Sequence, residues 1–271
     1  MHALLAHPAI QAIAAPFLVA LLSAEVLQRL RLSGLALIAG LAITVYLLSG
    51  LSFSLQGSMH KIVWLSIGAG LLGIPLSLAN RWLWRPVLMV LAAAATLWVA
   101  QHALLQHPLA ITLQWGAGCA LYVGWLVFWM DELHDSPLRA ASAGLGLALG
   151  TAAVLLLAGV SLPGKYDLAL GSAVFAYLLI MVASNSLLPC GRSFTLPLSL
   201  LAGLTACMGL LNANIPWYIL AVLAAIPVIG KLPASDRSPL WIGATLLGFA
   251  SLLLAVAAAY LSWRIHGWHA F

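Results

Sequence analysis

The stretch that decides the fold reads DELHDSPLRAASAGLGLALGTAAVLLLAGV and covers positions 131–160. Its first seven residues, 131–137, are mostly polar, and the 23 residues at 138–160 carry a single charge, on Arg139. An apolar helix of about 20 residues is long enough to cross the roughly 30 Å hydrocarbon core of a bilayer. The segment at 138–160 therefore predicts a membrane-spanning helix that follows a hydrophilic turn.

The composition of the whole chain agrees with this segment. The 271 residues are 64% hydrophobic and 6% charged, and the mean hydropathy is +1.09. Soluble domains carry about 25% charged residues, so a soluble globule, a disordered chain and a coiled coil are excluded. The 11 Lys and Arg residues are dispersed and form no basic stripe, which excludes nucleic acid as a partner. The sequence predicts an all-α, polytopic integral membrane helix bundle.

Division of the chain at charges, prolines and asparagines gives ten apolar segments, with connections of at most ten residues that leave no room for a soluble domain. We expect a single membrane domain over residues 1–271 with eight to ten transmembrane helices. The eighth and ninth segments are the weakest, and a re-entrant pair is an alternative there. The segments cover 9–29, 33–51, 62–79, 87–105, 111–130, 138–160, 168–188, 197–212, 216–230 and 240–262.

The basic residues predict the orientation, because cytoplasmic loops are enriched in Lys and Arg. With ten spans, one set of alternate turns holds Arg29, Arg31, Arg81, Arg85, Arg139, Arg192, Lys231 and Arg237. The other set, with the termini, holds Lys61, Lys165 and Arg264. The richer set should be cytoplasmic, which places both termini on the outer face of a bacterial-type inner membrane.

The polar turn at 131–137 divides the ten segments into five and five, so the possible halves are 1–130 and 138–271. An odd number of spans in each half would make the second half start from the opposite side of the membrane. This is the plan of an inverted repeat, which is common in secondary transporters. The spacing of Gly146 and Gly150 also indicates close helix packing.

Polar side chains within apolar segments are costly and mark candidate sites. Glu25 lies near the end of the first segment, and Arg29 follows one helical turn later on the same face. The pair either anchors the helix at the interface or supplies a coupling or substrate-binding carboxylate. Deeper neutral groups, Thr205 among them, form interhelical hydrogen bonds or selectivity contacts. The substrate or coupling candidates are Glu25, Arg29, Gln114, Asn185 and Asn212.

The turn at 131–137 contains the densest group of acidic side chains, Asp131, Glu132, His134 and Asp135. This group suits a hard cation or acid–base chemistry. A capped turn is the alternative, in which Asp135 or the next residue, a serine, caps a helix that begins with proline at its first position.

The histidines predict a possible metal site. On the expected topology, the outer face holds His60, His102, His107, His266 and His269, the last two spaced i, i+3. Imidazole suits copper, zinc and haem, so these residues are the metal candidates. The alternative is that neutral histidine is an ordinary interfacial residue, and we predict no other cofactor.

Three functions fit these features. The first is a permease for a small organic solute or ion, and the second is a membrane-embedded subunit of a larger redox or metal-handling complex. The third, an enzyme acting on a lipid-linked substrate, requires the acidic turn and Arg192 to converge. The sequence has neither G-x-S-x-G nor H-E-x-x-H, which makes an enzyme the weakest candidate. The expected partners are the lipid bilayer and either partner subunits or a second copy of the chain.

Overall fold

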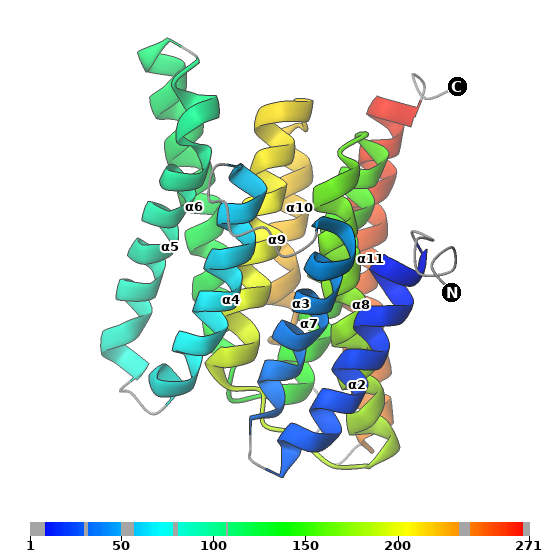
Figure 1. Cartoon of the computed structure of the whole chain (residues 1–271). Coiled ribbons are helices and arrows are strands. Elements are labelled where there is room, and N and C mark those ends of the chain that lie inside the picture. The colour runs from blue at the N-terminus through cyan, green and yellow to red at the C-terminus, as the bar shows by residue number, and fades with distance from the viewer. Residues whose placement is uncertain are drawn as a thin grey trace.

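The computed structural model describes residues 9–29, 32–49, 57–77, 81–106, 108–232 and 239–267, and within these ranges the regular elements are all helices (Figure 1). A short π-helical turn, Ile10–Ala14, leads directly into the first long helix. The α-helices are α2 (Ala15–Gln28), α3 (Ala36–Ser49), α4 (Ser58–Ser77), α5 (Arg81–Leu104), α6 (Leu109–Glu132), α7 (Pro137–Leu157), α8 (Ser161–Ala183), α9 (Gly191–Ala213), α10 (Trp217–Ile229) and α11 (Leu240–His266).

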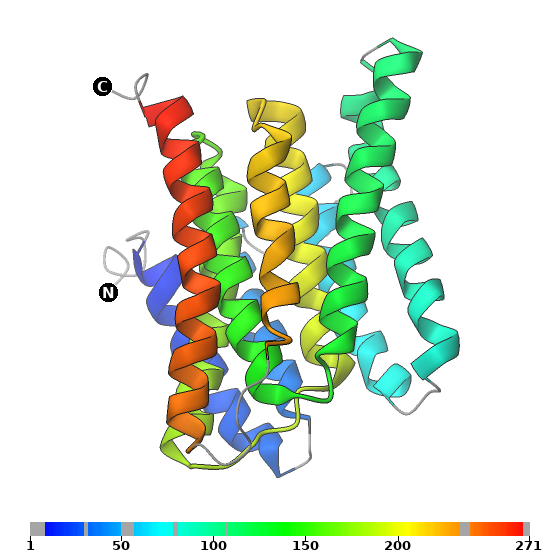
Figure 2. The same cartoon turned by 180° about the vertical axis from the view of Figure 1, so that it is seen from behind.

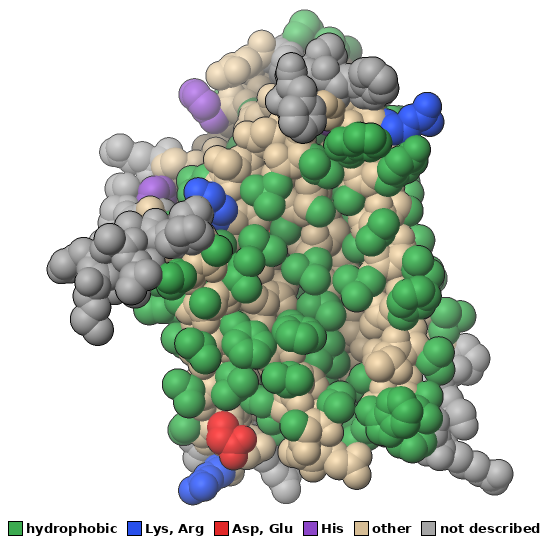
Figure 3. Space-filling view, turned by 90° about the vertical axis from the view of Figure 1, so that its right-hand side faces the viewer, with side chains coloured by type: hydrophobic (Ala, Val, Ile, Leu, Met, Phe, Trp, Pro, Cys, Tyr) green, Lys and Arg blue, Asp and Glu red, His purple; other side chains and the backbone are tan. Residues whose placement is uncertain are grey.

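The predicted fold class is confirmed, because each expected segment corresponds to a helix of the bundle. Within the described ranges, eight helices are long and apolar enough to cross a bilayer, while α3 and α10 are shorter. Figure 3 shows a broad hydrophobic band across one face, with charged side chains toward its upper and lower margins. This distribution is typical of a polytopic membrane protein.

The expected bounds of the eighth segment, 197–212, are wrong. Helix α9 begins six residues earlier, at Gly191, and Pro197 lies inside it. Proline is tolerated within transmembrane helices because neighbouring helices compensate for the lost hydrogen bond. Pro197 is buried against Gly70 of α4. Helix α9 is therefore long enough to cross the membrane, whereas α10 has only 13 residues.

Helix α9 forms the centre of the bundle, as Figures 1 and 2 show from opposite sides. Its side chains are buried continuously from Arg192 to Leu210. It packs mainly on α4 and α6, whereas α8 packs mainly on α2 and α7, and α7 packs mainly on α8 and α11. The bundle therefore contains two groups of closely packed helices, one around α9 and one around α8.

Successive helices alternate in direction, so the basic residues separate as predicted. We call the lower end in Figure 1, where α6 ends and α7 begins, the basic end; it carries Arg29, Arg81, Arg85, Arg139, Arg192 and Lys231. Lys61, Lys165 and Arg264 lie toward the opposite end, as do the start of the first helix and the end of α11. Arg31 and Arg237 lie outside the described residues. The assignment of the basic end to the cytoplasm and the division into repeated halves stay predictions.

Glycines allow α7 and α11 to pack closely. A Cβ atom on Gly146 would lie 2.6 Å from Ser251 Cβ on α11, and one on Gly150 would lie 3.0 Å from Ala255 Cβ. Ser251 also donates a hydrogen bond of 2.8 Å to the carbonyl of Ser142. The small residues at these positions therefore bring two helix backbones into contact, as the sequence predicts.

We expect Gly146→Ala to lower the free energy of unfolding by about 1–3 kcal/mol, because overpacking forces the two helices apart. Gly248→Ala on α11 is the matched control, since a Cβ there meets no atom within 4 Å. Thermal unfolding in detergent measures both variants. Equal melting temperatures for the two variants would contradict the close packing of α7 on α11.

Candidate functional site

The first buried polar group lies at the basic end, where three helices bring charged residues together. Asp131 is in the last turn of α6, Arg192 is the second residue of α9, and Arg85 is in the second turn of α5. Polar residues at helix ends are brought together here because the helices end at a common level. We call Arg85, Asp131 and Arg192 the basic-end cluster.

Arg192 and Asp131 form a bidentate ion pair. Arg192 Nε donates to Asp131 Oδ1 at 2.7 Å, and Nη2 donates to Oδ2 at 3.3 Å. Both side chains are only 1% exposed. The remaining Arg192 nitrogen, Nη1, donates to the carbonyl oxygen of Leu76 on α4. Fork-shaped pairing of this kind fixes the relative position of helices as well as charge.

Arg85 adds a second positive charge to this pair. Its Nε lies 3.4 Å from Asp131 Oδ2, its side chain is 20% exposed, and its guanidinium carbon lies 5.8 Å from the centre of the Phe128 ring. The Nε and Nη2 atoms are buried and make no hydrogen bond within the described ranges, so the contact of Nε with Asp131 is an ion pair alone. Two guanidinium groups therefore share one carboxylate, and the cluster has an excess positive charge that would favour a further anion.

A polar pocket of about 400 Å³ opens beside the cluster at the basic end. Cys190, Gly191 and Ser193 from the start of α9 line it, together with Ser77 and His134. Burial raises the pKa of the Cys190 thiol to about 12, with a smaller opposing effect from the hydrogen bond to Tyr177. The thiol therefore stays neutral at physiological pH and is a poor nucleophile.

We expect Cys190 to resist alkylation by maleimide in the folded protein, because only the thiolate reacts and because the side chain is buried. Cys119 and Cys207 are buried as well. Mass spectrometry should find no modified cysteine before denaturation and three afterwards, the number in the chain. Labelling of Cys190 in the native state at neutral pH would show that the pocket is more open than this geometry allows.

The second buried polar group surrounds Asp167, which lies six residues after the start of α8, about 9 Å along the helix axis. Asp167 is fully buried. Its Oδ2 accepts a hydrogen bond of 2.7 Å from Thr205 Oγ1 of α9, and the same hydroxyl lies 2.8 Å from the carbonyl oxygen of Leu201 in its own helix. We call Asp167, Thr205 and the neighbouring Tyr122 of α6 the carboxylate centre.

The carboxylate centre contains polar atoms that lack partners. Asp167 Oδ1 and the Tyr122 hydroxyl are buried and have no hydrogen-bond partner within the described ranges. The same ranges contain no Lys, Arg or His in an ion pair with Asp167. Tyr122 lies close enough to Asp167 for an electrostatic interaction. An unpaired carboxyl at this depth is costly, so it marks a functional position by default.

The substrate or coupling candidates predicted from sequence lie elsewhere. Glu25 and Arg29 are exposed at the basic end of α2, and Gln114, Asn185 and Asn212 are exposed as well. Asn185 adopts a positive φ of 48° in the link between α8 and α9, where it has a conformational role. None of these five belongs to either buried polar group, and their roles as candidates stay predictions.

The charged residues of the acidic turn pair with different partners. Asp131 enters the basic-end cluster, Glu132 forms a 2.6 Å ion pair with Lys231, and His134 Nε2 lies 3.0 Å from Asp135 Oδ1. Pro137 occupies the first turn of α7 as predicted, but the preceding Ser136 makes no side-chain capping hydrogen bond. The convergence of this turn with Arg192, which the enzyme hypothesis requires, is therefore observed through Asp131 alone.

The histidine candidates do not gather in the part of the chain that the structure describes, where no group of three or more potential ligands is close enough to hold a metal. His102 is near the end of α5 and His266 is at the end of α11, and Figure 1 places these ends on opposite sides of the bundle. His60 is at the start of α4. His107 and His269 lie outside the described residues.

Sequence reasoning missed Asp167 because the seventh segment was expected to begin at residue 168, which left Asp167 in a turn. The available signal was Pro163, since proline is favoured in the first turn of a helix. Helix α8 begins at Ser161 with Pro163 in that turn, and this shift of seven residues places Asp167 inside the bundle.

The chain matches no protein-family model, and no curated protein is significantly similar to it. The two buried polar groups are therefore the features of the described structure that indicate a function.

Proposed function

We propose that this multi-pass membrane protein is a proton-coupled transporter of a small solute, with Asp167 as the residue that carries the coupling proton. The observation that supports this most strongly is the buried Asp167 carboxyl, which accepts one hydrogen bond and forms no ion pair with a described cation. Intramembrane carboxyl groups of this kind form proton relays in transporters.

A proton fits the carboxylate centre better than a metal cation. Hard cations take six or more oxygen ligands, whereas the side-chain oxygens identified here come from Asp167, Thr205 and Tyr122. A proton needs only one free carboxyl oxygen, and Asp167 Oδ1 supplies it. The carboxyl would be neutral when it holds the proton and charged after release.

The position of Asp167 also couples its protonation to the packing of two groups of helices. Helix α8 packs mainly on α2 and α7, and α9 packs mainly on α4 and α6. The Asp167–Thr205 hydrogen bond joins these two groups of helices. Charged carboxylates accept stronger hydrogen bonds than neutral ones, so loading and release of a proton would alter the link between the groups. Movement of one helix group against another is the usual basis of alternating access.

Reconstitution tests the transport proposal. The purified protein is placed in liposomes that contain a pH-sensitive dye, a pH gradient is imposed, and labelled amino acids, sugars, nucleosides and organic acids are offered in turn. We expect at least one solute class to accumulate with the gradient and to acidify or alkalinise the lumen on addition. Absence of gradient-dependent accumulation and of proton flux for every class, relative to empty liposomes, would overturn the proposal.

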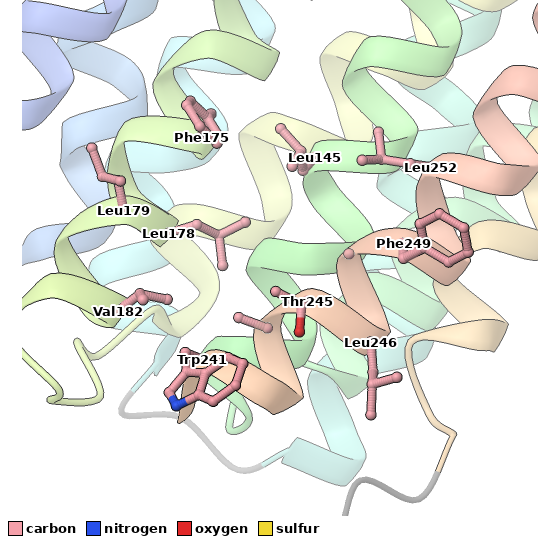
Figure 4. Close-up of a pocket in the computed structure, with 12 residues that line it drawn as sticks. Leu145, Phe175, Leu178, Leu179, Val182, Trp241, Thr245, Leu246, Phe249 and Leu252 are labelled. Carbon is pink, nitrogen blue, oxygen red and sulfur yellow. The ribbon is translucent and has the colours of Figure 1, made fainter. Parts of the chain in front are cut away.

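A role as a subunit of a larger membrane assembly is the second candidate, favoured by a surface groove of about 610 Å³. Figure 4 shows Phe175 and Leu179 of α8 on one side and Trp241 and Phe249 of α11 on the other, with Leu145 of α7 behind them. Such an apolar groove suits either lipid or a helix of another subunit. Purification from the native membrane in mild detergent distinguishes the candidates, because a subunit would remain with its partner in fixed proportion.

A further inference from the structure

A second apolar groove, of about 400 Å³, runs between α4 and α5 and has α6 and α9 as its floor. Helix α4 packs mainly on α9, and α5 packs mainly on α6, so the groove lies where two helix pairs meet. Trp64 and Leu72 of α4 and Leu91 and Trp98 of α5 line it and are each more than a third exposed. The groove is therefore open to the hydrocarbon that surrounds the bundle.

The length of this groove matches one leaflet of a bilayer. Its lining on α4 extends from Trp64 to Leu76, which corresponds to about 18 Å of helix. A leaflet contributes about half of the roughly 30 Å hydrocarbon thickness. The groove begins at the basic end, so an acyl chain of the leaflet on that side would fit along it. Its volume also lies within the range of small-molecule sites, roughly 300–1,000 Å³.

The basic-end cluster lies directly against the lower end of the groove. Leu88, Val127 and Leu196 line the groove, and each lies one helical turn from Arg85, Asp131 or Arg192 respectively. Leu76, a fourth lining residue, accepts a hydrogen bond from Arg192 through its carbonyl oxygen. The four helices that form the groove therefore all reach the cluster within one turn.

We propose that this groove binds one acyl chain of an anionic phospholipid, whose headgroup phosphate pairs with Arg85. The cluster has two guanidinium groups and one carboxylate, and Arg85, whose side chain is 20% exposed, is the member that a group outside the bundle can reach. A phosphate oxygen would accept a hydrogen bond from the accessible part of this guanidinium and balance the charge. The apolar groove selects a lipid over a soluble anion, and the excess positive charge selects an anionic lipid over a zwitterionic one.

Native mass spectrometry tests this lipid site. The protein is exchanged into detergent with equal amounts of phosphatidylglycerol and phosphatidylcholine that have identical chains, and the lipid that it retains is counted. We expect the wild-type protein to prefer phosphatidylglycerol by about tenfold, because both headgroups contain a phosphate but only phosphatidylcholine adds a cationic group near the two guanidinium groups. Equal retention of the two lipids would overturn the proposal that the cluster selects an anionic lipid.

Two variants, each with a matched control, distinguish binding of the headgroup from binding of the acyl chain. Arg85→Gln should abolish the preference for phosphatidylglycerol. Arg139→Gln should retain it, because Arg139 is a half-buried basic residue on α7, also at the basic end of the bundle. Gly68→Leu should block the groove, because a Cβ on Gly68 meets no atom within 4 Å and the side chain would enter the open space. Gly248→Leu is its control in the groove of Figure 4.

The two glycine variants test the binding of the acyl chain independently of Arg85. Thermal unfolding of each variant without lipid first establishes that it is folded. Unchanged lipid retention in Gly68→Leu, or equal loss in Gly248→Leu, would place the lipid elsewhere and overturn the proposal. Loss of preference in Arg139→Gln to the same extent as in Arg85→Gln would reduce the effect to general surface charge and would also overturn it.

Discussion

Asp131→Asn is expected to lower the free energy of unfolding by about 3–5 kcal/mol, the cost of removing one partner from a buried ion pair. The variant keeps the shape of the side chain but leaves the Arg192 guanidinium, which is 1% exposed, without an anion. Arg85 would lose its nearest carboxylate as well. Denaturant or thermal unfolding in detergent measures the loss.

Glu132→Gln is the matched control for this prediction. Glu132 is adjacent in sequence and also forms an ion pair, with Lys231 at 2.6 Å, but the two side chains are 27% and 34% exposed. An exposed pair contributes about 0–1 kcal/mol because water screens the charges. Glu132→Gln should therefore lower the free energy of unfolding much less than Asp131→Asn does.

A second substitution tests whether the buried charge is the cause. Addition of Arg192→Met to Asp131→Asn should restore part of the lost stability, because it removes the guanidinium that is fully buried. Arg85 is 20% exposed and retains access to water. Equal stability of Asp131→Asn and Glu132→Gln, or a further loss in the double variant, would contradict a basic-end cluster held by buried charge.

The helices could be predicted from sequence because each is encoded locally. The apolar run at 138–160 corresponds to α7, Pro137–Leu157, and the hydrophilic residues before it form the expected turn. Helix length and hydrophobicity are properties of consecutive residues, so one segment carries all the information needed. Prediction failed locally at Pro197, where burial against α4 keeps a helix continuous through proline.

The candidate site could be predicted only in its parts. Asp131 and Arg192 both appear in the sequence as candidates, but 61 residues separate them and their pairing depends on the packing of α6 against α9. Glu25 appeared to be the intramembrane carboxylate, yet it is exposed, and Asp167 is fully buried. Asp167 was assigned to a turn because the predicted start of its helix was seven residues too late. Helix boundaries are the least certain part of sequence prediction.

Asp167→Asn is expected to abolish accumulation of solute against its gradient, as a consequence of the proposed proton coupling. For one proton per solute, an imposed difference of about two pH units supports roughly hundredfold accumulation, since each tenfold step corresponds to 1.4 kcal/mol. An amide cannot release or bind the proton, so the variant should reach only equal concentrations on both sides. The amide oxygen still accepts the hydrogen bond from Thr205, which keeps the link between α8 and α9.

Glu25→Gln is the matched control for Asp167→Asn. It makes the corresponding change at the carboxylate that sequence alone favoured, and that side chain is exposed at the basic end of α2. We expect Glu25→Gln to accumulate solute as the wild-type protein does, while Asp167→Asn equilibrates it without accumulation. Wild-type accumulation by Asp167→Asn would remove Asp167 from the coupling step, because the only titratable group in the carboxylate centre besides the Tyr122 phenol would then be dispensable. Loss of accumulation in Glu25→Gln but not in Asp167→Asn would instead assign proton coupling to Glu25 on the surface of α2.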